Sequence, residues 1–279
     1  TRRFLMETMR KATVAILIVV LFICQAMLMG LFAVDVGASR MAVKDAVQKS
    51  DLIAELTEEA LEGKTVNQGG KYGDMIKDVM ASESMTNFFA AYISNGLKSM
   101  VYDVEFEEIA NDEITRAFKA GVDEVNASGR YDISGAQEDL FLTSMLAVLP
   151  DLTASLNETM SKYSATTVGN ADENVEQLAG NTTLKRLMKP TSRLIILAII
   201  LASILFIIML STKKGKTGSV RRGGWKVLLT IALVTSLYAI LGYRGVNGTD
   251  AVSQFTSILI KDGAMAVAIG GLIAMIILF

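Results

Sequence analysis

Four long apolar runs constrain this chain more than any other feature of its sequence. They cover residues 12–34, 194–210, 227–243 and 263–279, and none of them contains Asp, Glu, Lys or Arg. A helix that crosses a bilayer needs about 20 apolar residues, with a lower limit near 17. The first run also exceeds the ~7–15 apolar residues of a secretory signal core, so we interpret it as an uncleaved anchor. The sequence therefore predicts four transmembrane helices.

The basic residues predict which side of the membrane each segment occupies. Ten of them flank the runs in segments 1–11 and 211–226: Arg2, Arg3, Arg10, Lys11, Lys213, Lys214, Lys216, Arg221, Arg222 and Lys226. Basic residues collect on the cytoplasmic side of spanning helices, so both segments are expected inside. Alternation then places residues 35–193 and 244–262 outside and the C-terminus inside. One cluster of four basic residues, at 185, 186, 189 and 193, opposes this orientation.

The acidic residues are divided in the opposite sense. Residues 35–183 hold 26 acidic and 11 basic residues, whereas the rest of the chain holds 3 acidic and 16 basic residues. An acidic outer domain would repel phosphate groups, which argues against nucleic acid as a partner. Its carboxylates Glu105, Glu107, Glu108, Asp112 and Glu113 form a cluster that lacks the calcium-loop pattern, and we interpret it as a solvated turn.

The outer domain has a helical pattern. Apolar residues recur at spacings of three and four between Met85 and Val101, and again at Ile114, Phe118, Val122 and Val125. Asn111 or Asp112 is expected to cap the second of these helices, and Ser134 with Gln137 makes a capping box before a third. Only 104–107 alternates like a strand. The fold class is an all-α integral membrane protein, with a helical-bundle domain of 35–193 inserted between the first two spans.

Several kinds of chemistry are excluded by composition. The chain has no histidine, and its one cysteine, Cys24, lies inside the first run. Nucleophile–histidine pairs, imidazole ligands, thiolate metal clusters and internal disulfides are therefore impossible. We predict no catalytic residue, no cofactor and no metal, and a bacterial cytoplasmic membrane as the location. Asn-x-Ser/Thr triplets at Asn126, Asn157, Asn181 and Asn247 fall on the predicted outside, but such triplets arise often by chance.

Two sets of residues are candidates for contacts in the membrane. Small residues at four-residue spacing allow helices to approach closely, and they predict helix packing within the chain or a subunit interface. These are Ala26, Gly30, Ala198, Ala202, Ala266, Gly270 and Ala274. Basic residues near the ends of the runs predict contacts with lipid headgroups. These are Lys185, Arg186, Lys189, Arg193, Lys213, Lys214, Arg221 and Arg222.

Three functions fit these observations. The first is a non-enzymatic membrane protein that displays its acidic domain for partner binding or membrane-protein assembly, with lipids and another protein or a second copy of itself as partners. The second is a subunit of an oligomeric channel, since a pore can be lined by Thr, Ser and Gln. The third is an extracytoplasmic ligand sensor, because a helical insert between two spans is similar in layout to the sensor modules of bacterial chemoreceptors. The external segment 252–260 is expected either to lie flat at the membrane surface or to pack beneath the acidic domain.

Overall fold

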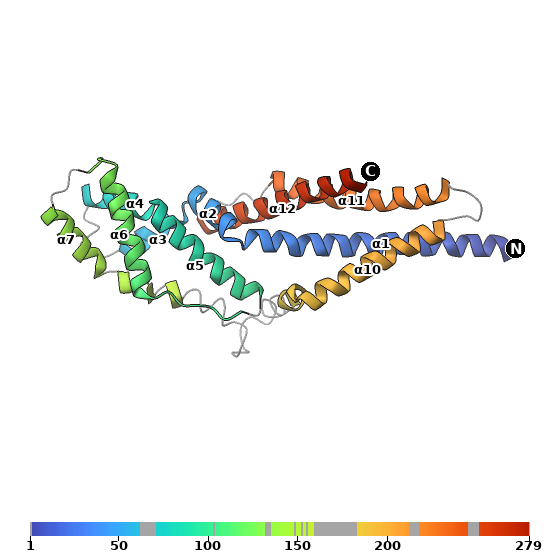
Figure 1. Cartoon of the computed structure of the whole chain (residues 1–279), viewed down its shortest axis with the longest axis horizontal. Coiled ribbons are helices and arrows are strands. Elements are labelled where there is room, and N and C mark those ends of the chain that lie inside the picture. Colours follow the sequence, from blue (N-terminus) through green and yellow to red (C-terminus); the bar gives the residue numbers. More distant parts are fainter. Residues whose placement is uncertain are drawn as a thin grey trace. The chain divides into compact units, whose positions relative to one another are not determined.

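The computed structural model of this chain consists of helices (Figure 1). It describes residues 2–61, 71–102, 104–131, 135–147, 149–151, 153–154, 156–158, 183–211, 218–244 and 251–278. The labelled helices are α1 (Arg2–Gly37), α2 (Arg40–Lys49), α3 (Leu52–Leu61), α4 (Lys71–Met80), α5 (Glu83–Val101), α6 (Asn111–Ala127), α7 (Gly135–Leu146), α10 (Pro190–Ser211), α11 (Gly218–Arg244) and α12 (Ala251–Leu278). No strand occurs among these residues, so the helical class predicted from the sequence is confirmed there.

The one strand-like alternation in the sequence, at 104–107, does not form a strand. Residues 104–110 have no regular structure and join α5 to α6. The apolar residues of this segment contact the core of the folded chain, and the acidic residues between them meet solvent. Ile109 is buried, Phe106 is half-buried, and the glutamates between them are exposed. A strand also needs a neighbouring strand for its backbone groups, and the described residues offer none.

Four helices are long and apolar enough to cross a membrane. They are found at Leu5–Gly37, Pro190–Ser211, Arg222–Arg244 and Ala251–Ile276. The chain is therefore a candidate multi-pass membrane protein with one span for each apolar run. Pro190 begins α10, as the sequence predicts, because the first turn of a helix does not need its missing N–H.

The first three candidate spans, and the fourth from Ile260 onward, belong to one compact unit, here called the span unit (1–37, 186–245 and 260–279). Glycines bring its helices close together. A Cβ at Gly263 would overlap the backbone carbonyl of Ala33, and a Cβ at Gly271 would overlap the hydroxyl of Thr235. Small residues thus hold α12 against α1 and α11, which is how helices associate where no hydrophobic driving force acts between them.

The remaining residues form a second compact unit, here called the acidic unit (38–185 and 246–259). It includes α2 to α7 and the beginning of α12. Phe255 of α12 is buried in the apolar core of this unit, and Ile258 and Leu259 pack against that core. Of the two arrangements expected for the segment 252–260, the structure therefore has the one in which it packs with the acidic domain.

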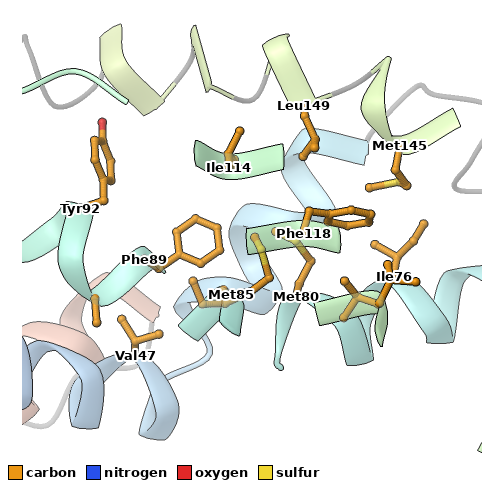
Figure 2. Close-up of a cluster of buried hydrophobic side chains, with 14 of the residues drawn as sticks. Val47, Ile76, Met80, Met85, Phe89, Tyr92, Ile114, Phe118, Met145 and Leu149 are labelled. Atoms are coloured by element: carbon orange, nitrogen blue, oxygen red, sulfur yellow. The ribbon is translucent and has the colours of Figure 1, made fainter. Parts of the chain in front are cut away.

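Large apolar side chains from several helices meet in the core of the acidic unit (Figure 2). Phe89 and Met85 come from α5, Phe118 from α6, and Phe141 from α7. The rings of Phe118 and Phe141 are stacked with their centroids 6.0 Å apart. Ile114, Phe118, Val122 and Val125 are all buried, which confirms the helix face that their spacing predicts.

The helix ends in this unit are fixed by side chains. Ser82 caps α5 by accepting a hydrogen bond from the Met85 amide at 3.3 Å. The carboxylate of Glu124, from α6, also accepts from the amides of Glu83 and Ser84 at 2.9 and 3.2 Å. These acceptors pair backbone donors that the first turn of a helix leaves free.

The cap predicted for α6 is wrong. The capping position holds Ala110, which makes no side-chain cap, so Asn111 and Asp112 both lie inside the first turn. There the Asp112 carboxylate pairs with Arg116, one turn later, at 3.2 Å. The predicted capping box at Ser134 lies outside the described residues.

Candidate functional site

The segment 104–110, here called the strap, carries three exposed glutamates, Glu105, Glu107 and Glu108. Ile109 is buried and anchors it. The side-chain amide of Asn157 donates to the Ile109 carbonyl at 3.1 Å, and its oxygen accepts from the Ile109 amide at 3.0 Å. The same oxygen accepts from the Tyr92 hydroxyl at 3.3 Å. One amide therefore ties the strap to α5.

An aromatic contact holds the strap from its other end. The ring of Phe106 meets that of Tyr92 edge to face, with centroids 5.7 Å apart. Tyr92 itself is only 6% exposed. Burial and the neighbouring Glu108 carboxylate raise the pKa of its hydroxyl above the usual range, so it stays neutral and can donate its proton to Asn157.

A cleft of about 640 Å³ opens between α5, the strap and the start of α6. On one side it is lined by Phe88, Ala91 and Tyr92 of α5. On the other it is lined by three exposed carboxylates: Glu107, Glu108 and Glu113. Its volume lies within the ~300–1,000 Å³ typical of ligand pockets.

Two arginines also line this cleft, and both have partners. Arg40 donates to the Asn87 carbonyl at 3.3 Å, and Arg116 pairs with Asp112. The carboxylates of Glu107, Glu108 and Glu113 make no ion pair or hydrogen bond with any residue that the structure describes. Arg40 keeps its positive charge because its partner is a neutral carbonyl, but three carboxylates against two guanidinium groups, one of them paired with Asp112, leave the lining of the cleft negative overall.

A second cleft, of about 540 Å³, lies on the other side of the strap. It shares Glu108, Ile109 and Ala110 with the first, and Pro150 and Thr153 line its other side. The strap is thus a narrow acidic segment between two hollows, and Asn157 lines the second of them. The amide nitrogen of Asn157, which begins one of the Asn-x-Thr triplets, donates to the Ile109 carbonyl in the folded chain.

The predicted small-residue contacts divide into two groups. Ala26 and Gly30 face α11: the Tyr238 hydroxyl donates to the Ala26 carbonyl at 2.9 Å, and a Cβ on Gly30 would come within 2.7 Å of that hydroxyl. Exposed positions are Ala198, Ala202 and Gly270, whereas Ala266 and Ala274 are half-buried. In α12 the inward glycines are Gly263 and Gly271, so the close contacts lie beside the predicted stripe.

The predicted lipid-contacting residues also differ among themselves. Arg193 makes two hydrogen bonds to the Asp35 carboxylate, at 2.6 and 2.9 Å, which join the beginning of α10 to the end of α1. Exposed residues are Arg186, Lys189 and Arg222, and Lys185 is half-buried. Lys213 and Lys214 lie outside the described residues, as does the side chain of Arg221.

Sequence reasoning missed the site at the strap because its parts are far apart in the chain. It interpreted the glutamates as a solvated turn, and it gave no structural role to Asn157, which is about 50 residues from the strap. The i, i+3 and i, i+4 spacing of Phe88, Ala91 and Tyr92 was a usable signal for one wall of the cleft.

No group of three Asp, Glu, His or Cys side chains among the described residues is arranged to hold a metal ion. Comparison with known proteins adds no further assignment. No family model matches this chain, and neither a curated protein nor a solved structure was found that is similar to it.

Proposed function

We propose that this chain is a non-enzymatic protein of a bacterial cytoplasmic membrane that holds its acidic unit outside the cell and binds a partner there. The observation that carries the proposal is the cleft at the strap: two carboxylates of the strap and one of α6, which make no ion pair or hydrogen bond with a described residue, line it. Charged groups left unpaired at a surface favour association with a partner of opposite charge. The charge division between 35–183 and the rest of the chain supports the outward orientation.

A photo-cross-linking amino acid in the full-length chain tests this proposal in living cells. Placed at Glu105, which is exposed on the strap, it is expected to give a discrete adduct with a second protein. Placed at Asp123, which is exposed on α6 and lines neither cleft described here, it is expected to give none. An adduct of twice the chain mass identifies a second copy as the partner. Equal labelling at both positions, or none at either, contradicts partner binding at the strap.

The cleft favours a ligand sensor as the second candidate function. Its volume suits a small molecule, and its mixed lining of aromatic, amide and charged side chains is typical of ligand sites. A sensor requires saturable binding of a small ligand to the intact protein. Thermal unfolding of the full-length protein with candidate ligands tests this function, because a ligand that binds only the native state raises the unfolding temperature.

A further inference from the structure

The two sides of the cleft differ in chemistry. Phe88, Ala91 and the largely buried Tyr92 contribute an apolar surface from α5. Glu107 and Glu108 of the strap and Glu113 of α6 contribute three carboxylates. A ligand that fits both sides must carry a hydrocarbon portion next to a positive charge, because an aromatic face and a carboxylate each attract a cation, and only the former contacts methylene groups favourably.

Other ligand classes match the cleft less well. An anion would meet three carboxylates against two guanidinium groups, of which that of Arg116 is already paired with Asp112. A divalent metal ion needs a cage of several oxygens, and no such group is arranged among the described residues. A neutral apolar ligand would desolvate the carboxylates without pairing them.

We propose that the cleft binds a primary alkylammonium group, with its methylene chain on α5 and its nitrogen at the carboxylates of Glu107, Glu108 and Glu113. This inference rests on the proposed function and names the chemistry of its ligand. A free polyamine and a lysine side chain of a partner protein share that chemistry. The first source corresponds to the sensor and the second to the binding of a protein partner.

Calorimetric titration of the full-length protein in nanodiscs of neutral lipid tests the proposal. The probes are spermidine, for the free polyamine, and trilysine, for a basic partner segment. The comparison ligands are 1,8-octanediol, which keeps a methylene chain without charge, and MgCl₂ at equal ionic strength. Saturable binding of spermidine or trilysine, with no binding of the diol and weaker binding of Mg²⁺, is expected. Tighter binding of spermidine identifies the free polyamine as the source, and tighter binding of trilysine identifies a partner segment.

Matched variants locate the binding at the cleft. The variant Glu107→Gln/Glu108→Gln/Glu113→Gln is expected to weaken binding about tenfold or more, from three lost ion pairs. The control Glu55→Gln/Asp74→Asn/Asp123→Asn removes the same charge from exposed positions that lie outside the strap and do not line the cleft. It is expected to change binding less than about threefold, through the long-range field alone. An equal loss in both variants, or no binding of either amine, overturns the proposal.

A steric pair of variants tests the site without changing charge. Ala91→Trp fills the cleft and is expected to abolish binding, whereas Ala127→Trp adds the same bulk at an exposed position and leaves binding unchanged. This pair tests binding at the cleft if the triple glutamate variant does not fold.

Amine binding in the cleft without any cross-link at Glu105 contradicts the partner function alone. A cross-link without amine binding contradicts the ligand assignment alone.

Discussion

A single amide, that of Asn157, makes three of the hydrogen bonds that hold the strap. It bonds both backbone groups of Ile109 and accepts from Tyr92. Asn157→Ala leaves these half-buried groups unpaired, so we expect it to lower the free energy of unfolding by about 1–3 kcal/mol. Asn95→Ala is the control, because Asn95 makes one long bond, of 3.5 Å, to the Glu107 carbonyl. Thermal unfolding of the detergent-solubilised protein measures both, and equal effects would show that Asn157 does not anchor the strap.

Tyr92 gives the acidic unit a dependence on alkaline pH. Burial and Glu108 raise the pKa of its hydroxyl, so above pH ~10 the unfolded chain loses this proton while the native protein keeps it. The native state then binds more protons, and stability falls as pH rises, by at most about 1.4 kcal/mol per pH unit from this residue. Tyr92→Phe is expected to be less stable at pH 8, through loss of the bond to Asn157, and to lose less stability between pH 9 and pH 11. Parallel pH profiles for the two proteins would contradict this role.

At the scale of elements, Gly121 on α6 permits a close helix contact. A Cβ there would come within 2.6 Å of the Ser82 hydroxyl, which caps α5, and within 3.2 Å of the Val79 carbonyl. Gly121→Ala therefore either displaces the cap or separates α4 from α6. We expect a loss of about 1–3 kcal/mol from this overpacking, although alanine is the better helix former. Gly73→Ala, in α4, is the control because its Cβ would have nothing within 4 Å, and it is expected to be neutral or stabilising. Thermal unfolding of the two variants checks the prediction, and a stable Gly121→Ala protein would contradict the contact.

The helices predictable from the sequence are those whose apolar face is long and regular. In α6, residues spaced by four, four and three are all buried, so periodicity alone identifies its inner face. The shorter helices α2 and α4 were not predicted. In α4 the buried residues Met75, Ile76, Val79 and Met80 do follow a helical spacing. They occupy a ten-residue helix, which is too short to be helical without the packing of its neighbours.

The periodicity of the sequence could not predict contacts between segments that are far apart in the chain. The start of α6 depends on Ala110, a residue without capping chemistry, and the strap depends on Asn157. Both are set by tertiary packing rather than by local preference. The cleft also depends on tertiary packing. A run of glutamates predicts that these side chains are exposed, but it does not predict which residues of α5 line the cleft with them. Sequence reasoning therefore located the acidic surface and missed the cleft within it.

At the scale of the whole molecule, the core of the acidic unit links two segments that are separated by two candidate spans. Phe255, at the beginning of α12, is buried with residues of α2 to α7. Between α7 and α12 the chain passes through α10 and α11, both of which are long and apolar enough to cross a membrane. Two crossings return a chain to its original side. The folded core therefore requires an even number of crossings between its parts, and this condition holds for either orientation of the chain in the membrane.

Sidedness of the chain can be tested by cysteine labelling in intact cells, because Cys24 is the only native cysteine. In a Cys24→Ser background, we expect a membrane-impermeant maleimide to label Glu105→Cys on the strap and Val252→Cys at the exposed start of α12. Lys213→Cys, in the basic link, is expected to react only after the cells are made permeable, since basic links are retained inside. Labelling of Lys213→Cys alone would invert the proposed orientation and move the acidic unit into the cytoplasm. Labelling of Glu105→Cys without Val252→Cys would place two parts of one core on opposite sides, and would contradict the fold itself.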